Sequence, residues 1–303
     1  MNKLVRKKDR MRSNKLTVFP IIIMVILLLY TTILFGLLAY ALFVSTRSPD
    51  RADFSGTYLM MTNKKFYFNL FEIFKLVHIS KSSGGESTLL NVVLNSLIYS
   101  VGSAFVKTLV PCLAAYACAR FEFKTSKIVY TAVLVAMMVP VVGSLPSELK
   151  LAYALGLVNN MAGVIMLKAN MLGLYFFVMY ASFKSMPDGY FEAAKIDGAN
   201  NWQILFRIGF PLVRNVFLTI VLINFVTFWN DYQTPMVYLL DKPTLGYVLW
   251  QLIAGTGVPG DTKLKTGVYA FNMVILSSLP VVTLFAIFKD RFMGSLTMGG
   301  IKG

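Results

Sequence analysis

A few ionisable and amide side chains interrupt long apolar segments of this chain, and they are its best candidates for binding chemistry. Lys107, Lys168 and Asp231 lie within such segments or at the end of one. An ionisable group at membrane depth is costly and marks a functional position by default. The amide side chains that can line the same polar interior are Asn170, Asn224, Asn230 and Asn272. A lysine–aspartate pair, or snorkelling of the ammonium group to a membrane surface, is the simpler interpretation for each lysine.

The residue types that most enzymes need are scarce. The chain has one histidine, His78, and two cysteines, Cys112 and Cys118, six residues apart in one apolar segment. That separation is not a same-face helical spacing, and neither a disulfide framework nor a metal pattern follows. The sequence contains no glycine–lysine phosphate loop and no paired catalytic carboxylates. We therefore expect no catalytic residues and no metal site, and we expect both cysteines to be buried packing residues.

The composition indicates the class of protein in which these ionisable and amide side chains lie. Of the 303 residues 56% are hydrophobic and 14% are charged, with a mean hydropathy of +0.65, which is too apolar for a soluble domain of this size. The net charge of +15 is scattered over the ends of apolar segments and forms no aromatic-interleaved patch, so it indicates membrane topology and not nucleic acid. The prediction is an all-α, multi-pass membrane protein with one membrane domain.

Six apolar stretches are candidates to cross the membrane, which takes about 20 residues for roughly 30 Å of hydrocarbon. We expect the spans at residues 18–44, 89–119, 128–145, 161–183, 212–229 and 268–288. The remaining parts are a basic N-terminus at 1–17, an outer loop at 45–88, a five-span core at 89–288 and a tail at 289–303. Short helices are predicted at residues 66–77 and 245–254. The basic short connections fall on one side, so the positive-inside rule places both termini in the cytoplasm.

A polar stretch at residues 187–211 separates two of the expected spans. Proline followed by an acid at Asp188 fits a helix start, and Gly198 suits a C-terminal cap. Asn200 or Asn201 can cap a second helical segment, which we expect Gly209 and Pro211 to end before the next span. The pattern predicts two short helices joined by a tight turn on the cytoplasmic surface.

The same stretch carries a recognisable signature. Glu192, Ala193 and Ala194, then Gly198, and finally Ile208 with Phe210-Pro211 resemble the EAA signature of permease subunits in bacterial ABC importers. The departure is Phe210, where that family usually has leucine. Trp229-Asn230-Asp231-Tyr232 followed by Pro235, and the glycine-rich ending at 294–303, are similar to the carbohydrate-uptake branch related to the second maltose permease subunit. The resemblance covers roughly residues 89–303.

This resemblance implies a type I importer permease whose EAA segment is a coupling helix that docks on a separate ATPase. The implied coupling residues are Glu192, Ala193, Ala194, Asp197, Gly198, Ala199, Ile208 and Pro211. The candidates for the translocation path are Lys107, Lys168, Asn224, Asn230, Asp231 and Asn272. The implied function is import of a carbohydrate, a di- or oligosaccharide, across the bacterial cytoplasmic membrane. The implied partners are ABC ATPase subunits, a second homologous permease and an extracytoplasmic solute-binding protein. The resemblance also implies that ATP and Mg²⁺ bind the ATPase and that no cofactor binds this chain.

Two other classes of membrane protein fit the sequence less well. A secondary transporter driven by an ion gradient usually has more spans, inverted repeats and midplane carboxylates, whereas here the single intramembrane acid, Asp231, lies at the end of a span. A membrane-embedded enzyme lacks its catalytic groups in this sequence. Disaccharides, oligosaccharides, glycerol phosphate and uronate oligomers all stay open as substrates, and lysines that both faced a cavity would favour an anionic sugar.

Overall fold

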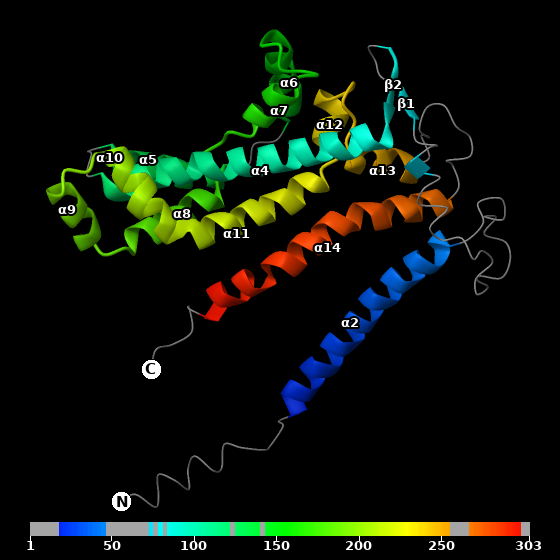
Figure 1. Ribbon diagram of the computed structural model, residues 1–303, viewed down its shortest axis with the longest axis horizontal. Coiled ribbons are helices and arrows are strands. Elements are labelled where there is room, and N and C mark those ends of the chain that lie inside the picture. The colour runs from blue at the N-terminus through cyan, green and yellow to red at the C-terminus, as the bar shows by residue number, and fades with distance from the viewer. Residues whose placement is uncertain are drawn as a thin grey trace, which may run out of the picture.

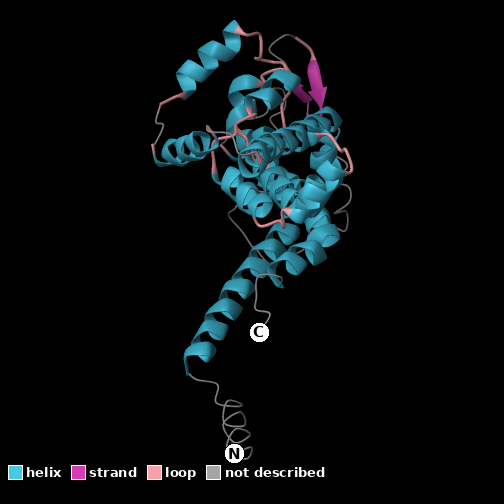
Figure 2. Ribbon diagram, turned by 90° about the vertical axis from the view of Figure 1, so that its left-hand side faces the viewer, coloured by secondary structure: helices cyan, strands magenta, loops and turns pink. Residues whose placement is uncertain are grey.

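The protein is helical almost throughout. The computed structural model describes residues 18–46, 73–74, 78–80, 84–121, 125–139, 143–254 and 267–297. Helices dominate these residues (Figure 2), which confirms the predicted all-α class. Two three-residue strands, β1 (His78–Ser80) and β2 (Glu86–Thr88), pair antiparallel before the second long helix. Most of the helix predicted at 66–77, the basic N-terminus at 1–17 and the end of the tail lie outside the described residues.

Two long helices form the centre of the molecule. Helix α4 (Leu89–Arg120) and helix α11 (Phe210–Trp229) lie side by side (Figure 1), and α8 (Leu174–Lys184) packs on the C-terminal half of α4. One buried cluster surrounds Tyr99 and Phe228, and a second surrounds Tyr116 and Phe183 nearer the C-terminus of α4. Cys112 and Cys118 are free and buried, as predicted.

The first and last long helices pack on each other. The C-terminal end of helix α2 (Val18–Ser45) contacts α14 (Gly267–Thr297), which also contacts α11, and the earlier turns of α2 are exposed (Figure 1). Asn272 Nδ2 donates to the Ser45 carbonyl at 3.2 Å, and the Tyr40 and Phe271 rings meet edge to face at 5.9 Å. Trp229 Nε1 donates to the Ser277 carbonyl at 2.8 Å and so ties α11 to α14. The first and last predicted spans are therefore confirmed as long helices.

Short helices cover the N-terminal end of α4. These are α6 (Leu145–Ala154), α7 (Met161–Leu167), α12 (Gln233–Tyr238) and α13 (Leu245–Ile253). Ser96 on α4 accepts a hydrogen bond from the Leu245 amide at 2.6 Å, and Asn95 donates to the Pro243 carbonyl at 3.2 Å. The short helix predicted at residues 245–254 is confirmed.

The prediction of six continuous spans is not confirmed. Among the described residues, four helices are long and apolar enough to cross a membrane: Phe19–Ser45, Leu89–Arg120, Asn201–Trp229 and Val268–Lys289. The predicted span at 128–145 corresponds to α5 (Ser126–Met138), whose 13 residues rise only about 20 Å. Its end has a local cause, because Val139 is extended and precedes Pro140, and a residue before proline is disfavoured in the helical conformation.

The predicted span at 161–183 is broken in its middle. It consists of α7 and α8, and residues 168–173 between them are not helical. Gly173 has a φ of 149°, which a residue with a side chain rarely adopts, and Asn170 Oδ1 accepts from the Leu172 amide at 2.7 Å. Apolar length indicated a membrane segment here, but local turn chemistry interrupts the helix.

The second helix of the polar stretch does not stop at Gly209 and Pro211, as the sequence had suggested. Helix α10 (Asn201–Ile204) continues through a π-helix, η2 (Leu205–Gly209), directly into α11. The Phe210 amide donates to the Leu205 carbonyl, five residues back. This widened turn accommodates Pro211, which lacks an N–H and disrupts a regular α-helix at the preceding turn. The segment and the span thus form one helix of 29 residues.

A close approach of α4 to α7 generates a stability prediction. A Cβ added at Gly102 would lie 2.7 Å from Ile165 Cδ1, whereas one added at Gly36 on α2 meets nothing within 4 Å. Gly102→Val is expected to destabilise the purified chain in detergent by about 1–3 kcal/mol through overpacking. Gly36→Val is the matched control and is expected to leave thermal unfolding unchanged. Equal melting temperatures for both variants would contradict this packing.

Candidate functional site

The polar stretch folds as a capped helix, a tight turn and a second capped helix. Helix α9 (Gly189–Ile196) begins at Asp188, whose carbonyl accepts from the Phe191 and Glu192 amides at 2.9 and 3.0 Å. It ends at Gly198, where φ is +78°. The Gly198 amide donates to the Lys195 carbonyl and the Ala199 amide to the Ala194 carbonyl, at 3.1 and 3.0 Å. This pair of bonds is a Schellman motif, and the predicted glycine cap is confirmed.

The second helix starts with a reciprocal cap. Asn200 Oδ1 accepts from the Gln203 amide and Gln203 Oε1 accepts from the Asn200 amide, both at 2.8 Å. Of the two asparagines the sequence offered, Asn200 is therefore the cap. Because both ends of the turn are satisfied locally, α9 and α10 keep a fixed relative orientation.

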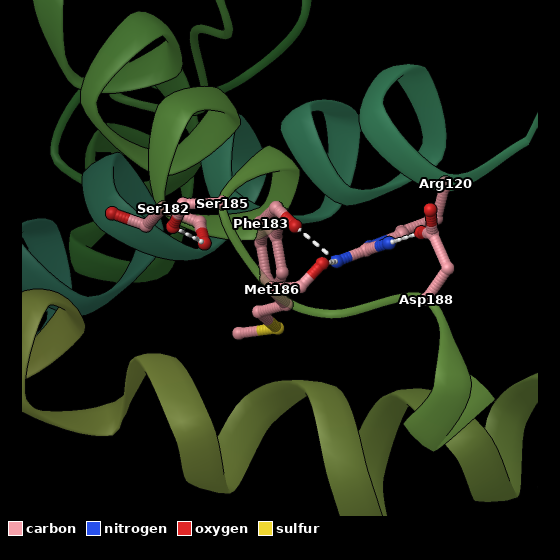
Figure 3. Close-up of polar contacts among 6 residues, drawn as sticks. All are labelled: Arg120, Ser182, Phe183, Ser185, Met186 and Asp188. Atoms are coloured by element: carbon pink, nitrogen blue, oxygen red, sulfur yellow. Dashed lines mark hydrogen bonds and ion pairs between the residues drawn. The ribbon is translucent and has the colours of Figure 1, made fainter.

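One arginine ties this segment to the end of α4. Arg120 Nη1 pairs with Asp188 Oδ1, and Nη2 donates to the carbonyls of Phe183 and of Met186, the latter at 2.8 Å (Figure 3). The guanidinium also lies 4.0 Å from the ring centroid of Phe191 on α9. The Arg120 side chain is 8% exposed and the Asp188 side chain is 81% exposed. We call these five residues the Arg120 clamp.

Sequence reasoning missed the Arg120 clamp. In the sequence, Arg120 belongs to a short basic connection between two predicted spans, and its positive charge indicates only the topology. A basic residue in the last turn of a helix is common because it interacts favourably with the helix dipole. No local signal connected it to carbonyls more than 60 residues away.

The coupling candidates divide into a buried and an outward set. Ala194 packs with Phe191 in the second core cluster, and Ala199 and Ile208 are partly buried against it. The candidates that face outward are Glu192, Ala193, Asp197, Gly198 and Pro211. A polar groove of about 410 Å³ runs between the end of α4 and α9 and includes Arg120, Glu192 and Lys195.

The outward side of the segment also carries large apolar side chains that sequence reasoning did not assign. Ile196 is 86% exposed, Trp202 66% and Tyr190 57%. The rings of Trp202 and Phe206 stack at 6.1 Å with an interplanar angle of 14°. Large apolar groups that stay exposed on a polar segment are candidates for contact with a protein partner.

A second polar group lies near the other end of α4. Tyr99 OH donates to Asp231 Oδ2 at 2.7 Å, and the Thr234 amide donates to Asp231 Oδ1 at 3.1 Å. Lys168 Nζ donates to Thr234 Oγ1 at 2.9 Å and lies 5.6 Å from the ring centroid of Phe228. The structure thus brings Lys168 and Asp231 together through Thr234, from the α7–α8 break and the end of α11.

The other path candidates are placed differently. Lys107 is half-buried on α4. Asn224 is buried and donates to Thr108 Oγ1 at 3.1 Å, between α11 and α4. Asn272 is buried in its contact with Ser45, and exposed Asn230 donates to a carbonyl of its own helix. A path-lining role stays a prediction for all of them.

Comparison with known proteins identifies the family. The model of the family described as binding-protein-dependent transport system inner membrane component matches residues 107–295, more than half of the chain. The chain belongs to this family. The permease is thus a non-catalytic membrane component of an ABC importer that works with a binding protein, as the EAA resemblance predicted.

Individual relatives agree with this assignment. The permease is 28% identical over 266 residues to the melibiose/raffinose/stachyose import permease of Bacillus subtilis, covering 87% of this chain and 91% of that protein. It is 28% identical to the diacetylchitobiose uptake system permease of Streptomyces coelicolor, over 69% of this chain and 68% of that one. An inner membrane ABC transporter permease of Escherichia coli is 30% identical, with 69% and 73% covered.

A solved structure shares the fold. The crystal structure of a bacterial ABC transporter involved in the import of the acidic polysaccharide alginate contains a chain that superposes with a TM-score of 0.71 at 20% identity. The match covers 91% of the permease and 96% of that chain. At this identity the likeness supports the permease fold alone.

The Arg120 clamp yields a local prediction. Arg120→Lys keeps the charge but loses the planar fork that reaches a carboxylate and two carbonyls at once. Amide exchange over residues 183–199 is expected to accelerate about tenfold or more, because each lost hydrogen bond contributes about 1 kcal/mol and 1.4 kcal/mol is tenfold. Hydrogen–deuterium exchange with mass spectrometry measures this directly. Arg207→Lys, at an exposed site on the π-helix, is the matched control, and identical exchange in both variants would contradict the clamp.

Proposed function

We propose that this permease imports a carbohydrate, a di- or oligosaccharide, as one half of a membrane pathway driven by a partner ATPase. The relatives named above for sugar uptake support the substrate class. Lacking a phosphate-binding loop, the chain depends on ATPase subunits to bind ATP and Mg²⁺. A second homologous permease encloses the other half of the pathway, and an extracytoplasmic binding protein delivers the sugar.

The observation that carries the proposal is the outward surface of residues 187–211. Burying a side chain such as Ile196 or Trp202 against a partner stabilises a complex by about 1.5–3 kcal/mol each. The cap at Gly198 and the reciprocal Asn200–Gln203 cap hold these groups on a preformed scaffold, which lowers the entropic cost of docking. Glu192 and Lys195 in the adjoining groove supply charges for specificity.

The proposed docking of the ATPase on residues 187–211 also implies the orientation of the permease in the membrane. An ATPase is cytoplasmic, so residues 187–211 and the C-terminal end of α4 face the cytoplasm. The positive-inside rule predicts the same side for the basic residues of the chain ends, such as Lys7 and Lys302. The Tyr99–Asp231 network lies toward the opposite face of the membrane.

The path candidates take two roles in this proposal. Lys107, Lys168, Asn230 and Asp231 line the translocation path. Asn224 and Asn272 stay candidates for the same path, and their hydrogen bonds also fix α11 to α4 and α14 to α2. Alternating access follows because ATP and the loaded binding protein prefer different orientations of the permease pair.

Docking is testable by co-purification. Trp202→Ala and Tyr190→Ala are expected to weaken ATPase capture at least tenfold, since truncated hot-spot side chains cost 2 kcal/mol or more, which is over tenfold. Tyr153→Ala is the matched control, because Tyr153 is 58% exposed and Tyr190 is 57% exposed. Equal loss in all three variants, or no loss at all, would contradict docking through this segment.

Coupling is testable after assembly. Gly198→Asp introduces a side chain at a φ of +78°, and Glu192→Ala removes the outward carboxylate. Both variants are expected to lose most substrate-stimulated ATPase activity and uptake in the reconstituted importer. Gly189→Ala, at a helical position with open space around it, is the control. Unchanged uptake by the importer that carries Gly198→Asp would contradict a coupling role for residues 187–211.

The substrate is testable with the whole importer in proteoliposomes. ATP-dependent uptake of a labelled oligosaccharide, delivered by the cognate binding protein, is the expected result. Uptake by the isolated permease under a proton gradient, without ATP or partners, would instead establish a secondary transporter.

A further inference from the structure

A groove of about 530 Å³ lies between three long helices, α4, α11 and α14. Its lining residues include Val101 on α4, Leu222 on α11 and Leu284 on α14. Helix α14 diverges from α11 toward its own C-terminus (Figure 1), and the groove lies between these two helices and α4. Side chains that face an unfilled space lose dispersion contacts, so a ligand that fits the groove restores them.

The lining fits a hydrocarbon ligand better than a sugar. Among the described residues that line the groove none is ionisable, and the one hydroxyl, Thr283 Oγ1, already donates to the Leu279 carbonyl at 2.7 Å. A sugar bound there would leave its hydroxyl groups without hydrogen-bond partners, which is costly. The groove also shares no residue with the polar network of Tyr99, Asp231 and Thr234.

One stripe of α11 leads from the groove to a basic residue. Phe225, Leu222 and Leu218 line the groove at helical spacing, and Arg214 lies one further turn along the same face. Arg214 and Phe225 are 11 residues apart, which is about 16 Å and roughly half of the ~30 Å hydrocarbon thickness. The groove with Arg214 at its end therefore has the depth of one membrane leaflet.

This depth and the volume favour an acyl chain over a protein helix. A transmembrane helix runs through both leaflets and is about 10 Å wide, so it occupies on the order of 1,000 Å³ in each leaflet. The groove holds about 530 Å³, which admits side chains of such a helix but not the helix itself. An acyl chain is thinner and stays within a single leaflet.

Two basic side chains lie at the Arg214 end of the groove. Trp229 at the end of α11 contacts Ser277, so the later residues of α14 lie beside the earlier residues of α11. Lys289 directly follows Phe288, a lining residue, and both Lys289 and Arg214 are exposed. Helix α11 contains no acidic residue, and among the described residues neither basic side chain forms an ion pair within 4.0 Å. The open end of an apolar groove thus carries positive charge.

We propose that this groove binds one acyl chain of an anionic phospholipid, with the lipid phosphate at Arg214 and Lys289. The hydrocarbon chain fills the space between α4, α11 and α14, and the two cations neutralise the headgroup at the membrane surface. Basic pockets between spanning helices bind anionic headgroups in this way. The bound lipid supports α14 against α11 where the two helices diverge. This inference goes beyond the transport function and does not depend on which solute is carried.

The test measures lipid binding to the purified complete importer, by native mass spectrometry and by thermal shift. The probes are phosphatidylglycerol, which is anionic, and phosphatidylcholine, which has no net charge, with identical acyl chains. Phosphatidylglycerol is expected to bind and to stabilise the importer at about tenfold lower concentration. Because the assay contains neither sugar nor ATP, its result does not depend on transport.

Charge variants assign the headgroup contact. Arg214→Gln combined with Lys289→Gln is expected to weaken phosphatidylglycerol binding about tenfold and to leave phosphatidylcholine binding unchanged. Lys127→Gln, at an exposed position at the start of α5, is the charge-matched control. Asp290 follows Lys289 in the sequence, and Asp290→Asn is expected not to weaken binding, because the proposed ligand is an anion.

A second pair of variants assigns the acyl chain. Val101 is 53% exposed and lines the groove, whereas Val135 on α5 is 50% exposed and does not. Val101→Trp is expected to fill the groove and to weaken binding of both lipids, because the chain loses its space. Val135→Trp is expected to bind both lipids normally.

Three outcomes overturn the lipid site. They are unchanged phosphatidylglycerol binding in the Arg214→Gln, Lys289→Gln double variant, unchanged binding in Val101→Trp, and equal losses in the matched controls. Cross-linking of a cysteine placed at Val101 to the second permease, with no lipid bound, would assign the groove to that subunit and also overturn the proposal. If the lipid binds as expected but the importer takes up no sugar, the lipid site stands and the proposed function fails.

Discussion

The contact on which the α8–α9 end of this permease depends is the buried guanidinium of Arg120. A cation that is 8% exposed needs partners for its donors, and here a carboxylate and two carbonyls accept from its terminal nitrogens, whereas its buried Nε has no partner among the described residues. These acceptors belong to the end of α8 and the start of α9, so one side chain fixes the end of α4 to both. Because Asp188 is largely exposed, the two carbonyls and the Phe191 ring contribute more to the clamp than the surface ion pair does.

Helix α4 connects this clamp to the polar network at its other end. Tyr99 and Arg120 are 21 residues apart on one helix, which is about 30 Å and close to the thickness of the hydrocarbon core. Helix α11 makes a parallel connection, because the π-helix joins α10 to it without a break and Asp231 lies just past its C-terminus. Residues 187–211 are therefore connected to Tyr99 and Asp231 through two packed helices. This connection is physical, since both helices have a contact at each end.

Features encoded in a few neighbouring residues were predictable from sequence, and features that depend on distant partners were not. The cap at Gly198, the start at Asp188 and the short helix after Thr244 each follow from local chemistry and occur as expected. The prediction of a continuous span at 161–183 was wrong because the stretch is apolar along its whole length, whereas the turns at Asn170 and Gly173 interrupt the helix. The prediction that the second helix ends at Pro211 was wrong, because a π-helix that accommodates a proline cannot be recognised from a hydrophobicity pattern.

The same difference between local features and distant contacts explains which parts of the two functional regions were predicted. The coupling candidates were found because they form one compact motif, whereas no sequence signal indicated that Trp202 and Ile196 are exposed. Neither the Arg120 clamp nor the Thr234 bridge was found, since each joins residues more than 60 positions apart. Whether a lysine in an apolar helix is paired depends on where the nearest carboxylate directs its oxygens. In this permease the Asp231 oxygens accept from Tyr99 and from the Thr234 amide, and Lys168 reaches Asp231 only through Thr234.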